Sequence, residues 1–544
     1  MGIAGEKKMK KEKKLSSNNK ENIENRAYLV GGGIASLSAA AFLIRDAGFP
    51  GNKISILEES AISGGSLDGS GTPRGGYVIR GGRMMNLSYL CTYDLFSSIP
   101  SYIEPKISVY QEILNFNRKI KSHSLSRVVE SGRKIDVTKM GFNHKNRMEL
   151  LRLLVKSEES CGANQIRDFF SDSFFETNFW YMWATMFAFQ PWHSLVEFKR
   201  YLHRFIHEFP RINTLAGVDR TPLNQFDSLV LPLQKWLKEK GVKFEYGCRV
   251  IDIDFQTDAI QKKAVGIRYT QKGRIKNTSL NEKDLLLITL GSMTEGSSLG
   301  SMKKAPKLLS KKAGGSWPLW EKIASKNNEF GNPKIFDERI AESKWESFTV
   351  TFKDPTFFDR MEKFTGNKAG TGGLVTFKDS NWLMSIVLAH QPHFLKQPAN
   401  IQVCWGYGLF PDKIGNFVHK RMSDCTGEEI LNELLGHLRF DDDRRKIINH
   451  AICIPCMMPF ITSQFLTRQT GDRPAVVPNG SVNFGFIGQF CEIPDDVVFT
   501  VEYSVRAARM AVYSLLNIKK EIPKVYKDPN TLKILFEATK TMFR

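Results

Sequence analysis

Long apolar runs are missing from this sequence, and none approaches the length that a transmembrane helix needs. The N-terminus also lacks the apolar core of a secretory signal peptide, because no hydrophobic segment follows its basic residues. Gly2 alone would suit myristoylation, but Glu6 occupies the position where that signal has serine or threonine. These absences predict a cytoplasmic protein without a membrane-spanning segment.

Cysteine is scarce as well: the 544 residues contain eight, scattered along the chain, as expected in a reducing compartment. Cys453 and Cys456 form a lone C-x-x-C pair. Because a structural zinc site needs a second pair of ligands, this spacing argues against a metal centre. We expect Ile454 and Pro455, between the two cysteines, to mark the end of a strand.

Acidic residues are outnumbered, since 77 lysines and arginines against 57 aspartates and glutamates leave a net charge of +20. Such an excess favours anionic partners, namely nucleic acid, an acidic lipid surface or a carboxylate substrate. Residues 1–26 carry eight basic and four acidic side chains and almost no apolar ones. We predict that they form a disordered basic tail ahead of two or three folded domains.

A glycine-rich stretch, residues 28–86, organises the rest of the chain. An apolar run leads into the turn Gly31-x-Gly33-x-x-Ser36, a helix is expected next, and a second apolar run ends at Glu58. Gly31 permits the turn, and Gly33 lets the backbone and the helix N-terminus approach a pyrophosphate. Ser36 departs from the usual glycine or alanine, whereas Glu58 stands where an acid accepts from a ribose hydroxyl. The pattern predicts a Rossmann-type dinucleotide site; the alternative is an ordinary strand–turn–helix without a ligand.

Aromatic residues are concentrated in residues 147–210, where two predicted helices are apolar on most faces and are interrupted at Gln190-Pro191. Helices of this kind are buried or line an apolar cavity. Core packing explains such a stripe more often than a ligand pocket does. The break between two such helices favours a pocket for an apolar molecule, and both interpretations stay open at this point.

Later segments have more varied patterns. A buried strand ends at Gly291-Ser292, where the chain is expected to return to the dinucleotide domain. Residues 300–345 are rich in Lys, Ser and Gly and are predicted to lie at the surface. Period-two alternation over residues 344–410 then predicts the antiparallel sheet of a substrate domain. A helix expected directly after Pro494-Asp495-Asp496 would offer backbone donors to a cofactor.

The segment beyond Pro523 has the pattern of a basic amphipathic helix. Its apolar positions and the basic residues beside them are Leu532, Leu535, Phe536, Phe543, Lys533, Lys540 and Arg544. A terminal helix of this composition can lie on an anionic membrane surface. A helix docked on its own protein has the same pattern, and the two interpretations are equally supported.

Several of these segments together resemble the oleate hydratase family, also called the myosin-cross-reactive antigen family. The matching segments include GGGIASLSAA, GGSLDG, RGGRMMN, MFAFQPWHS, KRYLHRFIH, LNQFDSLVLPL, PFITSQF and NFGFIGQFCEIPDDVVFTVEYSVRAA. They are colinear over roughly residues 26–530 and are jointly far more specific than a glycine fingerprint. The resemblance implies an FAD-dependent enzyme that adds water to the cis-9 double bond of unsaturated fatty acids, oleate to 10-hydroxystearate, without net redox.

The resemblance also implies roles for two residues in the reaction. Tyr201, in the KRY segment, corresponds to the proton donor of the family. Met84 stands where the family has its water-activating glutamate, and methionine cannot accept a proton. Three interpretations follow: the backbone or the reduced flavin holds the water, another group substitutes, or hydration is weakened.

Cofactor and substrate contacts are implied in the same way. In addition to Gly31, Gly33 and Ser36, the implied FAD contacts are Glu58, Gly65, Ser66, Arg83, Val250, Ser292, Asp496, Thr500 and Ser504. The spacing of the last three predicts that they share one flank of a helix. Gln225 and His393 correspond to side chains that bind the substrate carboxylate. Two further family positions are replaced by Val387 and Ala389, and His390 is expected to compensate as a donor.

The resulting prediction is an α/β fold: a Rossmann-type FAD-binding domain, a substrate domain with a mixed or antiparallel sheet, and a helical C-terminal part. The predicted segments are 1–26 (tail), 27–140 with 215–300 and 475–515 (FAD), 141–214 (apolar helices lining the pocket), 301–474 (substrate) and 516–544 (amphipathic). An unsaturated fatty acid is the expected partner and nucleic acid is not, while a homodimer stays open. Two rival functions are a flavin-dependent oxidoreductase or isomerase acting on fatty acids, and an FAD- and lipid-binding protein without turnover.

Overall fold

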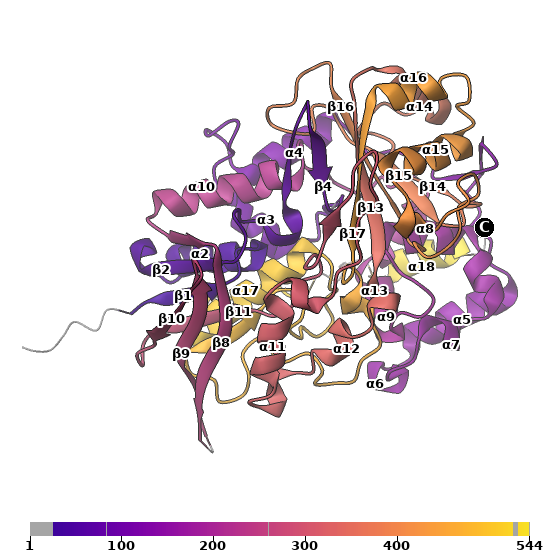
Figure 1. The fold of residues 1–544 in the computed structure, drawn as a ribbon. Coiled ribbons are helices and arrows are strands. Elements are labelled where there is room, and N and C mark those ends of the chain that lie inside the picture. The colour runs from indigo at the N-terminus through magenta and orange to yellow at the C-terminus, as the bar shows by residue number, and fades with distance from the viewer. Residues whose placement is uncertain (1–24, 83, 259, 526–530, 543–544) are drawn as a thin grey trace, which may run out of the picture.

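The computed structural model describes residues 25–82, 84–258, 260–525 and 531–542, with the backbone alone for residues 531–536. Two sheets organise the chain, and helices cover their faces (Figure 1). Nearly all of the predicted basic tail lies outside the described residues. None of the helices in the described ranges is both long enough and apolar enough to cross a membrane.

The first sheet contains five parallel strands in the order β18-β11-β1-β2-β7. They are β1 (Ala27–Val30), β2 (Ile54–Glu58), β7 (Lys243–Tyr246), β11 (Leu285–Thr289) and β18 (Phe484–Ile487). Helix α2 (Ile34–Arg45) follows β1, and α17 (Val501–Leu515) packs against α2. Because the strands are parallel, their carboxyl ends meet at one edge of the sheet, the usual ligand edge of such folds. The predicted Rossmann-type α/β fold is confirmed.

Two antiparallel units adjoin this sheet. One is the arm β8 (Cys248–Thr257), β9 (Lys262–Gln271) and β10 (Arg274–Ser279), seen at the lower left of Figure 1. The other is the ribbon β3 (Gly69–Thr72) and β4 (Gly76–Ile79). The N–H groups of Tyr77 and Ile79 donate to the hydroxyls of Thr351 and Thr349 at 2.8 and 3.1 Å. The ribbon is therefore hydrogen-bonded to the second large sheet.

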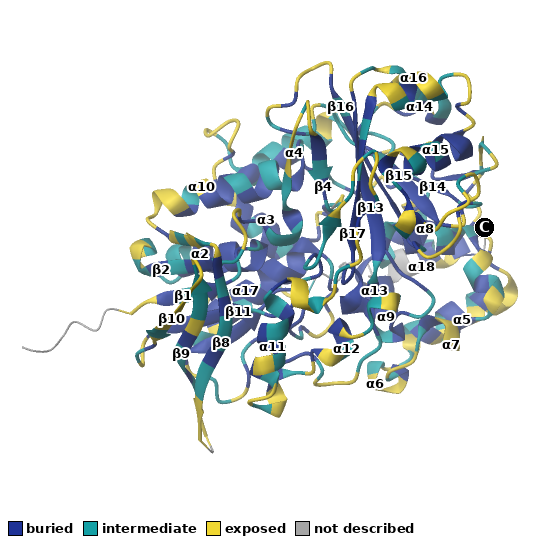
Figure 2. Cartoon of the chain, viewed as in Figure 1, coloured by how far each residue is buried: buried dark blue, intermediate teal, exposed yellow. Residues whose placement is uncertain are grey.

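The second sheet has eight strands in the order β12-β17-β13-β16-β15-β14-β5-β6 and is antiparallel except for the β14–β5 pair. Its strands are β5 (Val128–Glu130), β6 (Arg133–Lys134), β12 (Ser298–Leu299), β13 (Trp345–Phe352), β14 (Leu374–Phe377), β15 (Met384–Leu388), β16 (Gln402–Gly408) and β17 (Ala451–Met458). Every residue of β13 is buried, so this sheet is covered on both faces (Figure 2). The predicted mixed sheet is confirmed.

Helices α8 (Asn178–Phe187) and α9 (Leu195–Arg204) form the aromatic region, and the predicted interruption at Gln190-Pro191 falls between them. Helix α8 ends where Ala188 adopts a left-handed conformation, and Ser194 caps α9 by accepting from the N–H of Glu197. The other helices are α3 (Leu90–Ser97), α4 (Val109–Lys119), α5 (His144–Val155), α6 (Glu158–Cys161), α7 (Ile166–Phe169), α10 (Leu231–Glu239), α11 (Ser316–Ala324), α12 (Lys334–Asp337), α13 (Ile340–Ser343), α14 (Thr356–Thr365), α15 (Gly427–Leu438), α16 (Arg444–Asn449) and α18 (Thr531–Met542).

Two local predictions were wrong. Ile454 and Pro455 do not end a strand, because β17 pairs with β13 along its whole length and Pro455 lies opposite Phe348 in the ladder. Residues 300–345 are not simply a surface segment, since Trp317 and Trp320 of α11 are fully buried. Polar neighbours along the chain concealed this apolar face of α11.

Helix α18 is docked on the protein at its described end. Ala538 and Met542 are buried, and the Arg147 Nε donates to the carbonyl oxygen of Met542 at 2.9 Å. The two side chains close an apolar cleft over α5, α9 and the turn that follows α9. Four apolar positions of the predicted amphipathic face, Leu532, Leu535, Phe536 and Phe543, lie outside the residues whose side chains are described.

Candidate functional site

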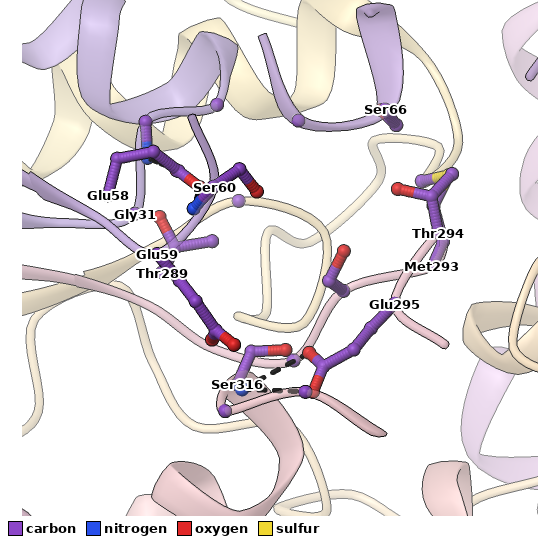
Figure 3. A pocket seen from close by; sticks show the side chains of 18 of the residues that line it. Gly31, Glu58, Glu59, Ser60, Ser66, Thr289, Met293, Thr294, Glu295 and Ser316 are labelled. Carbon is purple, nitrogen blue, oxygen red and sulfur yellow. Dashed lines mark hydrogen bonds between the residues drawn. The ribbon is translucent and has the colours of Figure 1, made fainter. Parts of the chain in front are cut away.

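A cavity of about 460 Å3 lies at the carboxyl ends of β1, β2 and β11 (Figure 3). Val30, Leu57 and Thr289, at or next to the last residues of these strands, line it. Eight of the residues predicted to contact a cofactor also line it: Gly31, Gly33, Glu58, Gly65, Ser66, Val250, Ser292 and Ser504. The structure therefore brings together residues from the N-terminal, central and C-terminal parts of the chain.

The glycine turn places bare backbone against this cavity. Gly31 has φ +89°, which favours glycine, and Gly33 is the N-cap of α2 without any side-chain cap. The first N–H groups of α2 consequently have no capping side chain on the cavity side, where an anion is best placed. Gly65, with φ +56°, lies directly against the glycine turn. A Cβ at position 65 would come within 3.1 Å of the Gly33 Cα.

The Glu58 carboxylate is hydrogen-bonded to the backbone of the glycine turn. It accepts from the backbone N–H of Gly32 and, at 2.7 Å, from that of Ser60. A Cβ at position 32 would lie 2.8 Å from the Glu58 Oε2, so a larger residue there would displace the carboxylate. The carboxylate is thus fixed at the end of β2, on the wall of the cavity.

Arg80 is a cavity residue that the sequence did not reveal. Its guanidinium donates to Asp68 Oδ1 at 2.7 Å, to the Gly65 carbonyl at 2.8 Å and to the Thr294 carbonyl at 2.9 Å. It joins the loop after β2 to the loop after β11, and both loops line the cavity. No local pattern marks such a residue, because the fold alone brings Thr294 next to Gly65 and Asp68.

Glu295 is a second residue found only in the structure. Its carboxylate accepts from the N–H of Ser316 at 3.1 Å, at the start of α11 (Figure 3). Burial, and then the charge of Glu59, raise the pKa of Glu295 to about 8. The cavity wall therefore holds a carboxyl group that is largely protonated at neutral pH.

The other predicted cofactor residues lie elsewhere. Ser36 is buried inside α2, where its hydroxyl lies 3.3 Å from that of Thr289, so it supports the packing of the helix on β11. Asp496 is buried 2.9 Å from the Arg506 Nε and 3.6 Å from the Arg204 Nε. Arg83 is outside the described residues.

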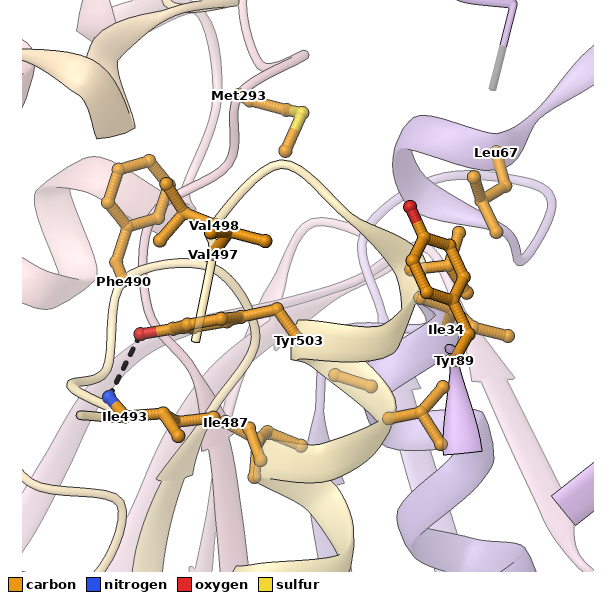
Figure 4. Packing of buried hydrophobic residues seen from close by; sticks show 14 of the residues in the cluster. Ile34, Leu67, Tyr89, Met293, Ile487, Phe490, Ile493, Val497, Val498 and Tyr503 are labelled. Atoms are coloured by element: carbon orange, nitrogen blue, oxygen red, sulfur yellow. Dashed lines mark hydrogen bonds between the residues drawn. The ribbon is translucent and has the colours of Figure 1, made fainter. Parts of the chain in front are cut away.

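The prediction that Asp496, Thr500 and Ser504 share a helix flank was wrong. Helix α17 begins at Val501, and Thr500 is its N-cap, accepting from the N–H of Tyr503 at 3.2 Å. Asp495 and Phe499 have φ of +64° and +73°, which an α-helix does not allow. Figure 4 shows Val497 and Val498 in this loop on one side of the Tyr503 ring, with Ile487 and Ile493 on the other.

A smaller cavity of about 70 Å3 holds the two residues predicted to act in the reaction. Tyr201 and Met84 both line it, together with aromatic and aliphatic side chains from α8, α9 and the loop before α17. Tyr201 is 1% exposed, and its hydroxyl donates to the Val498 carbonyl at 2.5 Å. The rings of Phe187, Phe189 and Phe465 surround it at 4.9, 5.0 and 5.7 Å between centroids.

Buried ion pairs fix the helix that carries Tyr201. Glu197 of α9 pairs with Arg473 at 2.9 Å and with Arg468 at 3.1 Å. Arg200, one residue before Tyr201, pairs with Glu158 and Glu492, each at 2.8 Å. Removing one partner of such a buried pair is strongly destabilising, so the position of α9 is tightly specified.

The two cavities share a wall built around Gln489. Its Nε2 donates to the Thr500 carbonyl at 2.9 Å and to the Ser504 hydroxyl at 2.8 Å, and its Oε1 accepts from the N–H of Phe499. Gln489 and Ser504 line the larger cavity, whereas Phe499 and Thr500 line the smaller one. The hydrogen bonds of this one side chain therefore link the linings of the two cavities.

The residues predicted to bind a carboxylate line neither cavity. Gln225 is buried, with its Nε2 3.9 Å from the Sδ of Met85, a residue of the smaller cavity. The segment with His393 adjoins it, because the His393 carbonyl accepts from the N–H of Asn224 at 2.8 Å. His390 packs edge-on against Phe116, with 5.2 Å between the ring centroids. Burial lowers the pKa of both histidines, that of His393 to about 4.

Comparisons with known proteins agree with this geometry. The fold resembles that of an oxidoreductase from Methanosarcina mazei, with a TM-score of 0.51 at 13% identity, over 90% of this chain and 100% of that one. An oleate hydratase of Streptococcus pyogenes is 41% identical over 95% of this chain and 89% of its own length. A linoleate hydratase of Lactiplantibacillus plantarum is 34% identical over 96% of this chain and 99% of its own. The family model described as the MCRA family matches residues 24–513, and the chain belongs to that family.

Proposed function

We propose that the protein is an FAD-dependent hydratase that adds water to the cis-9 double bond of unsaturated fatty acids, converting oleate to 10-hydroxystearate. One observation carries the proposal: Tyr201 and Met84 line one small, mostly apolar cavity that shares a wall with the dinucleotide cavity. The two relatives described above are named oleate and linoleate hydratase, which supports the same substrate class.

The larger cavity suits FAD. The uncapped start of α2 would hold the pyrophosphate, Glu58 would accept from the ribose, and Val250 would lie by the adenine. Ser292 and Ser504 would lie toward the flavin end. When bound, the flavin would order the adjoining site without a net change of redox state.

Tyr201 would act as the general acid. Its phenol would transfer a proton to one carbon of the double bond, leaving a cation on the other carbon that water then attacks. The rings of Phe187 and Phe205, which line the cavity, can stabilise positive charge through their π faces. The same rings exclude bulk water, so the cation would meet only a water molecule held in the site.

The substrate carboxylate would bind outside the smaller cavity, toward Gln225 and His393. Since burial lowers the pKa of His393 to about 4, its imidazole is neutral at pH 7 and would donate a hydrogen bond rather than a full charge. His390 would assist from the neighbouring turn. The contact of Gln225 with Met85 supports a carboxylate site beside the proposed reaction cavity.

Isotope labelling tests the proposed function. The FAD-loaded protein is incubated with oleate in H2(18)O, and the product is analysed by mass spectrometry. A hydroxy acid carrying the label, without stoichiometric consumption of reductant, supports hydration. Stoichiometric NADH loss or peroxide formation would instead identify an oxidoreductase. Tight oleate binding without any product would identify a binding protein, the alternative that Met84 favours.

The setting of the protein in the cell is a separate part of the proposal. A cytoplasmic location, with peripheral contact to an anionic membrane, is compatible with the net charge of +20. The docking of Ala538 and Met542 on α5 limits such a contact to the remaining surface of α18. Co-sedimentation with anionic and with neutral vesicles tests it, because equal recovery with both would contradict the charge argument.

A further inference from the structure

The cavity shared by Tyr201 and Met84 contains a carboxylate that the sequence did not single out. Among the described residues that line it, Glu208 is the acidic one. It lies in the 3-10 turn Ile206–Arg211, directly after α9, and its side chain is buried with 4% exposure. A carboxylate so placed lies close to any water molecule that the cavity admits.

Three groups hold the Glu208 carboxylate. Its Oε1 accepts from Asn86 Nδ2 at 2.9 Å and from Arg211 at 2.8 Å, and its Oε2 accepts from the Arg211 Nε at 2.7 Å. The His207 Nε2 lies 3.3 Å from Oε1. The backbone of Gly217 touches the carboxylate on another side, since a Cβ there would lie 2.0 Å from Oε2.

Burial opposes the charged form of Glu208, but the hydrogen bonds from His207 and Arg211 lower its pKa to about 2. The group is therefore a carboxylate throughout the neutral range, ready to accept hydrogen bonds from water. Among the described residues, the Arg211 Nε is the donor to Oε2, whereas a carboxylate oxygen accepts two hydrogen bonds. Capacity for one more donor remains at that atom.

We propose that Glu208 accepts the proton of the attacking water. Met84 cannot take this role, because its side chain has no carboxylate. The inference rests on the proposed hydratase function. The Tyr201 O–H bond breaks as a C–H bond forms from the π pair of the alkene. A water lone pair then forms the C–O bond at the cationic carbon, and the proton that this water loses passes to Glu208. Return of that proton to Tyr201 through solvent closes the cycle, and no oxidant or reductant is consumed.

The weak basicity of Glu208 does not oppose this role. Water bound to a carbocation is an oxonium ion, a much stronger acid than any carboxylic acid, so a carboxylate of low pKa still takes its proton. The negative charge also stabilises the cation as it develops, an effect that is large in a site that excludes water.

Asp219 is the rival carboxylate. Its backbone pairs with that of Met85, but its side chain faces Tyr93, whose hydroxyl lies 3.5 Å away, and it does not line the cavity. Burial raises the pKa of Asp219 to about 6. The charged and titratable groups around the two carboxylates are His207, Arg211, Tyr89 and Tyr93. Glu208 is favoured as the base because it lines the cavity, whereas Asp219 is favoured by its higher pKa.

Substitutions distinguish the two candidate bases, Glu208 and Asp219. In the FAD-loaded protein, Glu208→Gln is expected to lower kcat by about 100-fold or more while KM changes little. Asp219→Asn tests the rival. Glu149→Gln is a matched control, since Glu149 of α5 is equally buried and accepts from the N–H of Ser171, away from the cavity. Flavin absorbance and thermal unfolding show that each variant is folded and loaded.

A double variant and a pH profile extend the test. Met84→Glu combined with Glu208→Gln should recover turnover, because a carboxylate again faces the same cavity. The kcat of the unmodified chain should stay flat from pH 7 to pH 5 if Glu208 is the base, and should fall below pH 6 if Asp219 is. The assignment of Glu208 as the base is overturned if Glu208→Gln leaves kcat unchanged. It is also overturned if the kcat of the unmodified chain falls below pH 6. Absence of labelled product from the unmodified chain overturns the proposed function instead, and the inference with it.

Discussion

Tyr201 donates its phenolic hydrogen to the backbone carbonyl of Val498 at 2.5 Å, which joins α9 to the loop before α17. Both partners are buried, and ion pairs through Glu197 and Arg200 hold the helix from the other side. The phenol ring is thus positioned by contacts that do not involve any ligand. For the proposed proton transfer, the O–H would have to turn from the Val498 carbonyl toward the substrate.

Replacing Tyr201 by phenylalanine removes the proton and leaves the ring. We expect hydration to fall by at least about 100-fold, because general acid catalysis contributes that much or more. FAD content, read from the flavin absorbance, should be unchanged. Val218→Ala alters the same cavity and leaves Tyr201 and the aromatic rings in place; an equal loss in that variant would show that packing rather than proton donation is responsible.

Replacing Met84 by glutamate adds a carboxylate to the smaller cavity. We expect kcat to rise by about tenfold if water activation limits turnover. Met84→Gln is the matched control, since glutamine has the same length and no charge. A similar rate in both variants and the unmodified chain would show that position 84 does not contact the reacting water.

Gly65→Ala should weaken FAD binding. Its Cβ would come within 3.1 Å of the Gly33 Cα and push the turn away from the pyrophosphate position. Gly48→Ala is a control with the same kind of backbone strain, because Gly48 has φ +66° but no atom within 4 Å of the added Cβ. We expect at least about a tenfold rise in Kd for the first variant alone, measured by flavin titration. Equal affinities would contradict the assignment of this turn.

Glu295 makes stability depend on pH. Because burial raises its pKa from 4.5 to about 8, the group stabilises the fold fully below pH 4.5, and this contribution is lost as the pH rises toward 8. Glu295→Gln should therefore have a higher Tm than the unmodified chain at pH 8 and the same Tm at pH 4.5. A constant difference at both pH values would show that the carboxyl group does not titrate in this range.

Much of the fold was predictable from local signals. The apolar runs around Gly31 and Gly33 specify a strand, a turn and a helix, and the interruption at Gln190-Pro191 separates α8 from α9 because proline cannot continue a helix. Alternation of period two marked the central strands of the second sheet in the same way. Each of these patterns is complete within a short stretch of chain.

The parts that escaped prediction depend on distant contacts. Arg80, Glu295 and Glu208 are ordinary charged residues in the sequence, and only the fold brings them to a cavity wall. The predicted start of α17 was wrong because Asp495 and Phe499 adopt positive φ, which cannot be predicted from their residue types. Pro455 inside β17 is tolerated for a similarly non-local reason: β12 pairs only with Cys456 and Met457, so at Pro455 the ladder with β13 is on one side of the strand.

Because Gln489 is hydrogen-bonded to residues that line both cavities, it can couple ligand binding in one cavity to binding in the other. Whatever displacement of this amide accompanies filling of the larger cavity is felt at Phe499 and Thr500, on the far side of the wall. By thermodynamic reciprocity, the proposed flavin and acyl chain would change each other's affinity by the same factor, whichever of them binds first. Gln489 is the side chain through which that coupling would run.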